Sequence, residues 1–74
     1  MTREEILAGL QNLVGMNVDE ALHHLDWSDV CLTMRVVEIA GVPVEPLDEI
    51  VEYTFDVKVE QGNITTIVEL YDAL

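Results

Sequence analysis

The sequence predicts an α+β domain in which one or two N-terminal helices pack on a small three-stranded sheet that ends in a β-hairpin. Two observations lead to this prediction. Apolar residues recur at helical spacing in the first third of the chain, and they alternate with polar residues towards its C-terminal end. The 74 residues are expected to form one domain, residues 1–74, and half of them are hydrophobic, which is enough for a core.

Two helix starts are visible in the first 25 residues. Thr2 and Glu5 form a capping box for a helix from Arg3 to about Leu13, and Gly15 is placed to stop it. Asn17 has the position of the N-cap of a second helix, and acidic residues follow it in the first turn. We expect each helix to bury one stripe. These stripes are Ile6, Leu7, Leu10, Leu13 and Val14 in the first helix, and Val18, Ala21, Leu22 and Leu25 in the second.

The next part of the chain predicts a connector at residues 26–29 and a strand from Val30 to Ala40. Trp27, in the connector, is expected to cover one edge of the core, and the alternative is a ligand-stacking role. Cys31 is the only cysteine. We expect it to be a packed or surface residue, because no arrangement of histidine and carboxylate accompanies it. Alternation places Leu32, Met34 and Val36 on one face of the strand, and Thr33, Arg35 and Val37 on the other.

The stretch from Thr54 to Leu70 predicts the hairpin. Its first strand alternates between Phe55, Val57 and Val59 on one face and Thr54, Asp56, Lys58 and Glu60 on the other. The apolar face is expected to lie under the helices, so Val57→Asp should unfold the domain, whereas Asp56→Val should be tolerated. Gly62 and Asn63 tolerate positive φ and therefore predict the turn. Residues 71–74 are expected to form a short tail.

The segment from Gly41 to Ile50 is the candidate binding loop. Pro43 and Pro46 restrict its backbone, and apolar residues lie between acids. One interpretation is a stiff connector whose apolar residues fold back on the core, and the other is an exposed loop that binds a partner. The candidate partner-binding residues are Val42, Val44, Glu45, Leu47, Asp48 and Glu49.

The net charge of −12 comes from fifteen acids and only three basic residues. Phosphate backbones would repel such a chain, so we expect no direct binding to nucleic acid. No apolar run is long enough to span a membrane, and we expect no membrane association. The acids either form a solvated surface or bind another protein with a basic surface.

No catalytic site or cofactor site is evident from the residue pattern. There is no phosphate-binding glycine loop and no zinc spacing, and His23 and His24 are adjacent, so they would point in different directions on a helix. We therefore expect no enzymatic activity, no cofactor and no bound metal. The single cysteine and the lack of a visible signal peptide favour the cytoplasm, or the host cytoplasm for a phage-encoded protein.

Two segments of the chain carry a resemblance to a known family. Leu13–Ala21 reads LVGMNVDEA, and Phe55–Glu60 reads FDVKVE and is followed by Gly62-Asn63-Ile64. They resemble the helix entry and the penultimate strand and turn of the potato inhibitor I family of serine-protease inhibitors. The resemblance spans about residues 10–70, and it implies a helix, a strand, an extended reactive loop and a terminal hairpin.

The chain departs from that family where activity would be expected. Residues 10–12 replace the family's Trp-Pro-Glu, and Thr54 and Asp56 stand where the family has arginines that hold its loop. The leading hypothesis is therefore a small acidic protein-binding inhibitor or interaction module that acts through the proline-stiffened loop. The first alternative is an acidic mimic of nucleic acid, a phage-type decoy that blocks a nuclease, restriction or CRISPR complex. The second is a structural subunit of an assembly.

Overall fold

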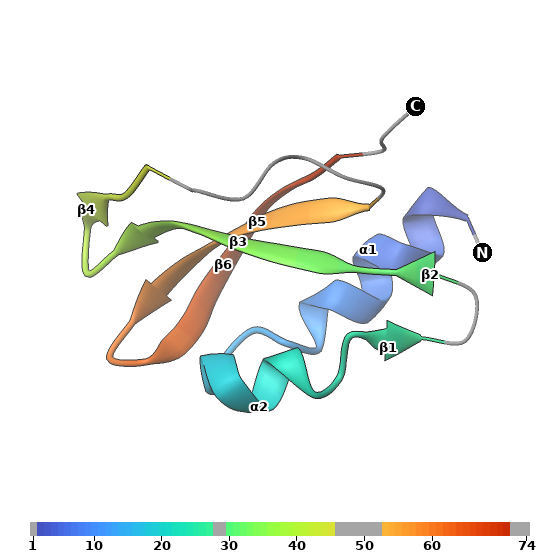
Figure 1. Ribbon diagram of the computed structural model, residues 1–74, viewed down its shortest axis with the longest axis horizontal. Coiled ribbons are helices and arrows are strands. Elements are labelled where there is room, and N and C mark those ends of the chain that lie inside the picture. Colours follow the sequence, from blue (N-terminus) through green and yellow to red (C-terminus); the bar gives the residue numbers. More distant parts are fainter. Residues whose placement is uncertain (1, 28–29, 46–52, 72–74) are drawn as a thin grey trace.

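The computed structural model describes residues 2–27, 30–45 and 53–71. In chain order its elements are α1 (Arg3–Gln11), α2 (Val18–Leu22), β1 (Asp26–Trp27), β2 (Val30–Cys31), β3 (Thr33–Ile39), β4 (Val42–Pro43), β5 (Thr54–Glu60) and β6 (Asn63–Tyr71). A four-stranded sheet has the order β4-β3-β5-β6, and β1 pairs with β2 separately (Figure 1). The α+β class and the terminal hairpin are confirmed, but β4 adds a fourth strand to the three that were expected.

Helix α1 begins with the capping box that the sequence predicts. The Thr2 hydroxyl accepts a hydrogen bond from the Glu5 backbone N–H, and the Glu5 carboxylate accepts one from the Thr2 N–H. The helix ends at Gln11, two residues before the predicted end. Gly15 has a φ of +90°, which an L side chain would resist. Val14 lies beyond the helix and is exposed, so its assignment to the buried stripe is wrong.

Helix α2 also has its predicted N-cap, because the Asn17 side chain accepts a hydrogen bond from the Asp19 N–H at 2.9 Å. Its five residues make little more than one turn. So short a helix turns only a narrow face towards the core. Ala21 is buried there and Leu25 follows it into the core, whereas Leu22 is exposed and was wrongly placed in the stripe.

The pairing of the strands explains where the chain reverses. β3 runs parallel to β5, and β5 pairs antiparallel with β6. The β5–β6 turn places positive φ at Gln61 (+51°) and Gly62 (+81°), the pattern of a tight two-residue hairpin. Asn63 is therefore the first residue of β6 and not part of the turn, and Tyr71 ends β6 instead of starting a tail.

The core lies between the helices and one face of the four-stranded sheet. Figure 1 shows both helices on the same side of that sheet. Ile6 and Leu10 of α1 are fully buried, as are Phe55, Val57 and Ile64 of the hairpin. This confirms the predicted apolar face of β5.

The polar side chains on the opposite face of the sheet are not all exposed to solvent. Asp56 is only 4% exposed, and its carboxylate accepts hydrogen bonds from Arg35 Nε at 2.7 Å and Arg35 Nη2 at 3.0 Å. The reason is the parallel register, which places Arg35 of β3 directly opposite Asp56 of β5. Asp56 does point away from the core face, as predicted, but it is buried in an ion pair, so we expect Asp56→Val to destabilise the protein rather than to be tolerated.

Candidate protein-binding site

A second tight turn positions the candidate site at the end of β3. Ala40 and Gly41 have φ of +51° and +80°, so they form a two-residue turn that folds β4 back along β3. The Ala40 N–H donates to the Val59 carbonyl at 2.9 Å, and the Val44 N–H donates to the Val37 carbonyl at 2.9 Å. The start of the predicted extended loop is thus a hairpin that is hydrogen-bonded to β5 at its turn and to β3 after β4.

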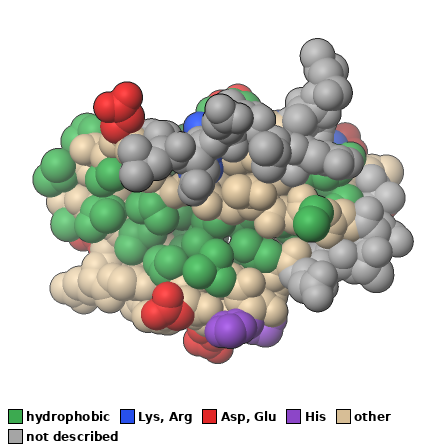
Figure 2. Space-filling model, viewed as in Figure 1, with side chains coloured by type: hydrophobic (Ala, Val, Ile, Leu, Met, Phe, Trp, Pro, Cys, Tyr) green, Lys and Arg blue, Asp and Glu red, His purple; other side chains and the backbone are tan. Residues whose placement is uncertain are grey.

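Three aliphatic side chains are exposed on this hairpin. Ile39 is 49% exposed, Val42 is 63% exposed and Val44 is 37% exposed. We call these three residues the apolar tip. Ile39 and Val42 are cross-strand partners and Val44 follows two residues later, so all three share one face. Figure 2 shows hydrophobic side chains gathered over this end of the molecule.

The apolar tip is a continuation of the core face of the sheet. A register shift between Val36 and Glu38 changes the phase of β3, so that Ile39 pairs with the core residue Val59. Glu38 pairs with Lys58 on the other face, and their charged groups lie 3.9 Å apart. Without this bulge, strict alternation would have placed Glu38 on the apolar face and Ile39 on the polar one.

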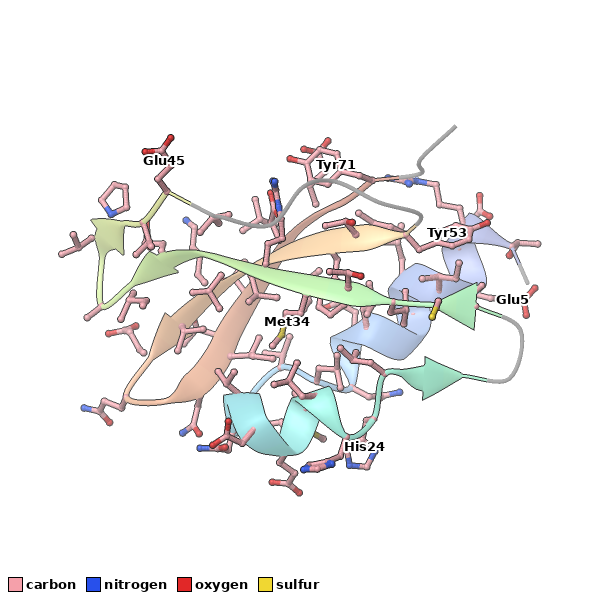
Figure 3. The ribbon with its side chains drawn as sticks, viewed as in Figure 1. Glu5, His24, Met34, Glu45, Tyr53 and Tyr71 are labelled. Atoms are coloured by element: carbon pink, nitrogen blue, oxygen red, sulfur yellow. The ribbon has the colours of Figure 1, made fainter. Side chains whose placement is uncertain are left out.

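Carboxylates accompany the apolar tip. Glu45 follows Val44 and is exposed, and Figure 3 shows its side chain pointing away from the sheet. Glu60, at the end of the neighbouring strand β5, is also exposed. An apolar centre beside negative charges suits a partner with an apolar pocket and a basic rim.

A polar cluster holds the strands together on the other face of the sheet. The Arg35 guanidinium carbon lies 5.5 Å from the centre of the Tyr71 ring, within the range of a cation–π contact. Hydrogen bonding to Glu69, together with a further hydrogen bond to Asp56, raises the pKa of Tyr71 to about 12. Hydrogen bonding to Asp56 also raises the pKa of Arg35. The cluster thus joins β3, β5 and β6.

The structure brings part of the predicted site together. Val42, Val44 and Glu45 are exposed and adjacent, as the binding-loop interpretation requires. The other three candidates, Leu47, Asp48 and Glu49, lie outside the described residues. Ile39 was missed, because it was read as part of a strand with strict alternation. The dipeptide Ala40-Gly41, which ends the strand, was the available signal for a turn that exposes its neighbours.

A further concave region lies among the described residues. A cavity of about 310 Å³ opens between the C-terminal end of α1 and the segment after α2, and it is lined by Gly9, Asn12, Leu13, Met16 and His24. Among the residues with described positions, no group of three or more His, Cys, Asp or Glu side chains could hold a metal ion. Neither of the two helices described is long and apolar enough to cross a membrane.

Comparison with known proteins adds no information about this site. No protein family matches the chain, and comparisons with curated proteins and with solved structures found no similar protein.

Proposed function

We propose that this protein is a small acidic interaction module that binds another protein through the apolar tip and the loop that continues from it. The observation that carries the proposal is the exposure of three aliphatic side chains, Ile39, Val42 and Val44, on one face of a hydrogen-bonded hairpin. A preformed apolar surface loses little conformational entropy on binding, which favours its use as an anchor. The protein has no catalytic role in this proposal.

The partner in this proposal has a basic surface. All three basic side chains of the protein already have partners within the chain. Arg35 binds Asp56, Lys58 lies 3.9 Å from Glu38, and Arg3 donates to the Leu70 carbonyl at 2.7 Å. The remaining acids give the surface a strongly negative character, which attracts a positively charged partner and accelerates association. The two would meet in the cytoplasm, or in the host cytoplasm if the protein is phage-encoded.

Inhibition is the form of binding that we favour. The parallel strands β3 and β5 are neighbours in one sheet, so the connection between them is held at both ends by the same rigid element. This arrangement supports the resemblance to the potato inhibitor I family, in which such a loop occupies a protease. The absence of arginines at residues 54 and 56 argues for a different target class.

Binding measurements on matched variants test this proposal. The partner is first captured from the native host and identified by mass spectrometry, and its binding is then followed by surface plasmon resonance. Val42→Ala and Val44→Ala should each weaken binding by about 1–3 kcal/mol, mainly through faster dissociation. Val68→Ala is the control, because Val68 is a similarly exposed valine, 47%, on β6. Equal effects of Val42→Ala and Val68→Ala would contradict the proposal.

The charge of the loop has its own test. Glu45→Lys should mainly slow association, whereas Glu20→Lys on α2 should have a smaller effect. Leu47→Ala, Asp48→Lys and Glu49→Lys extend the same comparison along the loop. If these loop variants behave like Glu20→Lys, the loop does not contribute to binding.

A nucleic-acid mimic is the second candidate, and the internal pairing of all three basic residues favours it. In that case the apolar variants would be nearly silent. Losses would instead add over acids on several elements, such as Glu4 on α1, Glu20 on α2 and Glu69 on β6, and affinity would fall steeply with salt. The same binding measurements at two salt concentrations distinguish the two candidates.

A further inference from the structure

The outer edges of the four-stranded sheet are protected to very different degrees. β6, at one side, is covered at both ends. Near its start the Gly15 N–H donates to the Ile64 carbonyl at 2.7 Å, and the Ile64 N–H donates to the Met16 carbonyl at 2.9 Å. Near its end the Leu70 carbonyl accepts from Arg3 Nη2 at 2.7 Å. Only a short central stretch of this edge is open to another strand.

Further features discourage strand addition at β6 and β4. The pairing of β6 with β5 shifts register twice, and such bulges twist an edge away from a potential neighbour. Glu69 adds a charge to the same edge. β4 has only two residues, and Pro43 has no backbone N–H to donate. These are the usual means by which proteins avoid unwanted pairing at sheet edges.

In the described ranges, the outer edge of β3 has no paired strand between Thr33 and Val37. The Thr33 N–H points inwards to the Tyr53 carbonyl, at 3.2 Å. Alternation along the strand then turns the backbone groups of Met34 and Val36 outwards. β4 covers the edge only from Val37 onwards, where the Val37 carbonyl accepts from Val44. Within the described part of the chain, the outward backbone groups of Met34 and Val36 have no strand beside them.

Apolar side chains flank this open stretch. Met34 and Val36 are half-buried against the core, and Figure 3 shows Met34 pointing from β3 towards the helices. Ile39, which is 49% exposed, continues the surface into the apolar tip. Figure 2 shows hydrophobic side chains running across the centre of this face towards the β4 end.

The net charge indicates which kind of strand would fit. A second copy of the chain would bring −12 against −12 and is disfavoured by repulsion. A strand with alternating apolar and basic residues would place its apolar side chains beside Met34 and Val36. Its basic side chains would lie on the other face, where Glu38 pairs with Lys58 and Arg35 pairs with Asp56, and the net negative charge of the chain would attract them. We infer that the outer edge of β3 between Thr33 and Val37 accepts an extended, lysine- or arginine-containing segment of another protein as an additional β-strand.

A model peptide tests this inference without knowledge of the natural partner. The probe is a ten-residue peptide of alternating valine and lysine, titrated into ¹⁵N-labelled protein and followed by NMR. We expect the amide signals of Met34 and Val36 to shift and their hydrogen exchange to slow. A peptide of equal charge in which prolines replace two valines cannot form the ladder, and we expect it to bind at least about tenfold more weakly. Equal binding of both peptides, shifts centred elsewhere, or no binding would overturn the inference.

A backbone substitution provides a second test. Cys31 allows the chain to be assembled by ligation of residues 1–30 to residues 31–74, with an N-methyl group on Met34. The change removes one outward N–H and keeps every side chain, and we expect about tenfold weaker binding of the Val-Lys peptide. Val68→Ala is the control, because Val68 is an exposed valine on β6, at the opposite edge of the sheet, and it should leave this binding unchanged. Undiminished binding of the Val-Lys peptide after N-methylation would overturn the inference. If the methylated chain does not fold, the amide shifts that the peptide causes in the unmodified protein test the inference instead.

Discussion

The buried centre of β5 offers the most direct test of the fold. Val57 is fully buried, and it lies opposite Val36 of β3 and Ile67 of β6. A domain of this length is expected to have a free energy of unfolding of about 4–11 kcal/mol. Val57→Asp buries a carboxyl group with no partner, which costs several kcal/mol whether it is ionised or takes up a proton. We therefore expect this variant to be unfolded at pH 7.

A graded series at the same position makes the reasoning quantitative. Val57→Ala removes two methyl groups and leaves a cavity, for an expected loss of about 2–3 kcal/mol. Val57→Thr keeps the shape and buries a hydroxyl group, for a loss of about 1–3 kcal/mol. Urea denaturation followed by circular dichroism measures each value. Thr66→Asp is the control, because Thr66 is exposed opposite Lys58, and its effect should stay within about 0.5 kcal/mol.

The outcome that would refute this reasoning is a folded Val57→Asp variant with nearly unchanged stability. Since side chains alternate between the faces of a strand, such a result would mean that the register of β5 is displaced by one residue. The helices would then have to pack on the face that carries Arg35 and Asp56.

Two further predictions concern the polar cluster. Asp56→Val and Arg35→Met should each lower the melting temperature. The double variant should be more stable than either single variant, because it leaves no unpaired charge. If the two losses in melting temperature simply add in the double variant, this prediction is contradicted. Hydrogen bonding to Glu69 and Asp56 raises the pKa of Tyr71 to about 12 from an ordinary value of 10.0, so the folded chain holds this proton more tightly than the unfolded chain. The stability of the fold should therefore decrease as the pH rises through this interval. In the Tyr53→Phe variant Tyr71 is the remaining tyrosine, so an absorbance titration of this variant should report its raised pKa. A Tyr71 pKa near 10 would argue against the hydrogen bonds to Glu69 and Asp56.

The features that the sequence predicted correctly are those that depend on neighbouring residues. The capping box of Thr2 and Glu5 and the N-cap at Asn17 are local hydrogen bonds, so their spacing in the chain is sufficient evidence. The apolar face of β5 follows from alternation over seven residues. The positive φ of Gly15 and of Gly62 is likewise a local backbone requirement.

The errors arose where a residue's environment depends on a distant strand. Asp56 looked solvent-facing because polar residues usually are, but the parallel neighbour β3 supplies Arg35 and covers it. The exposure of Ile39 depends on the register shift next to Val37 and on a turn that begins at Ala40. Neither the parallel pairing nor the bulge leaves a clear local signal, because both are set by tertiary packing.

The lengths of the elements explain why apolar surface remains open at one end of the sheet. Helix α1, with nine residues, is about 13 Å long, and α2 is only about 7 Å long. Strand β6, with nine residues, extends about 30 Å. Two such helices cannot cover the whole apolar face of the sheet, and the uncovered end is where Ile39 and Val42 lie. A chain selected only for stability in isolation would be expected to carry polar residues there, so the exposed aliphatic residues are consistent with the proposal that another protein binds this face.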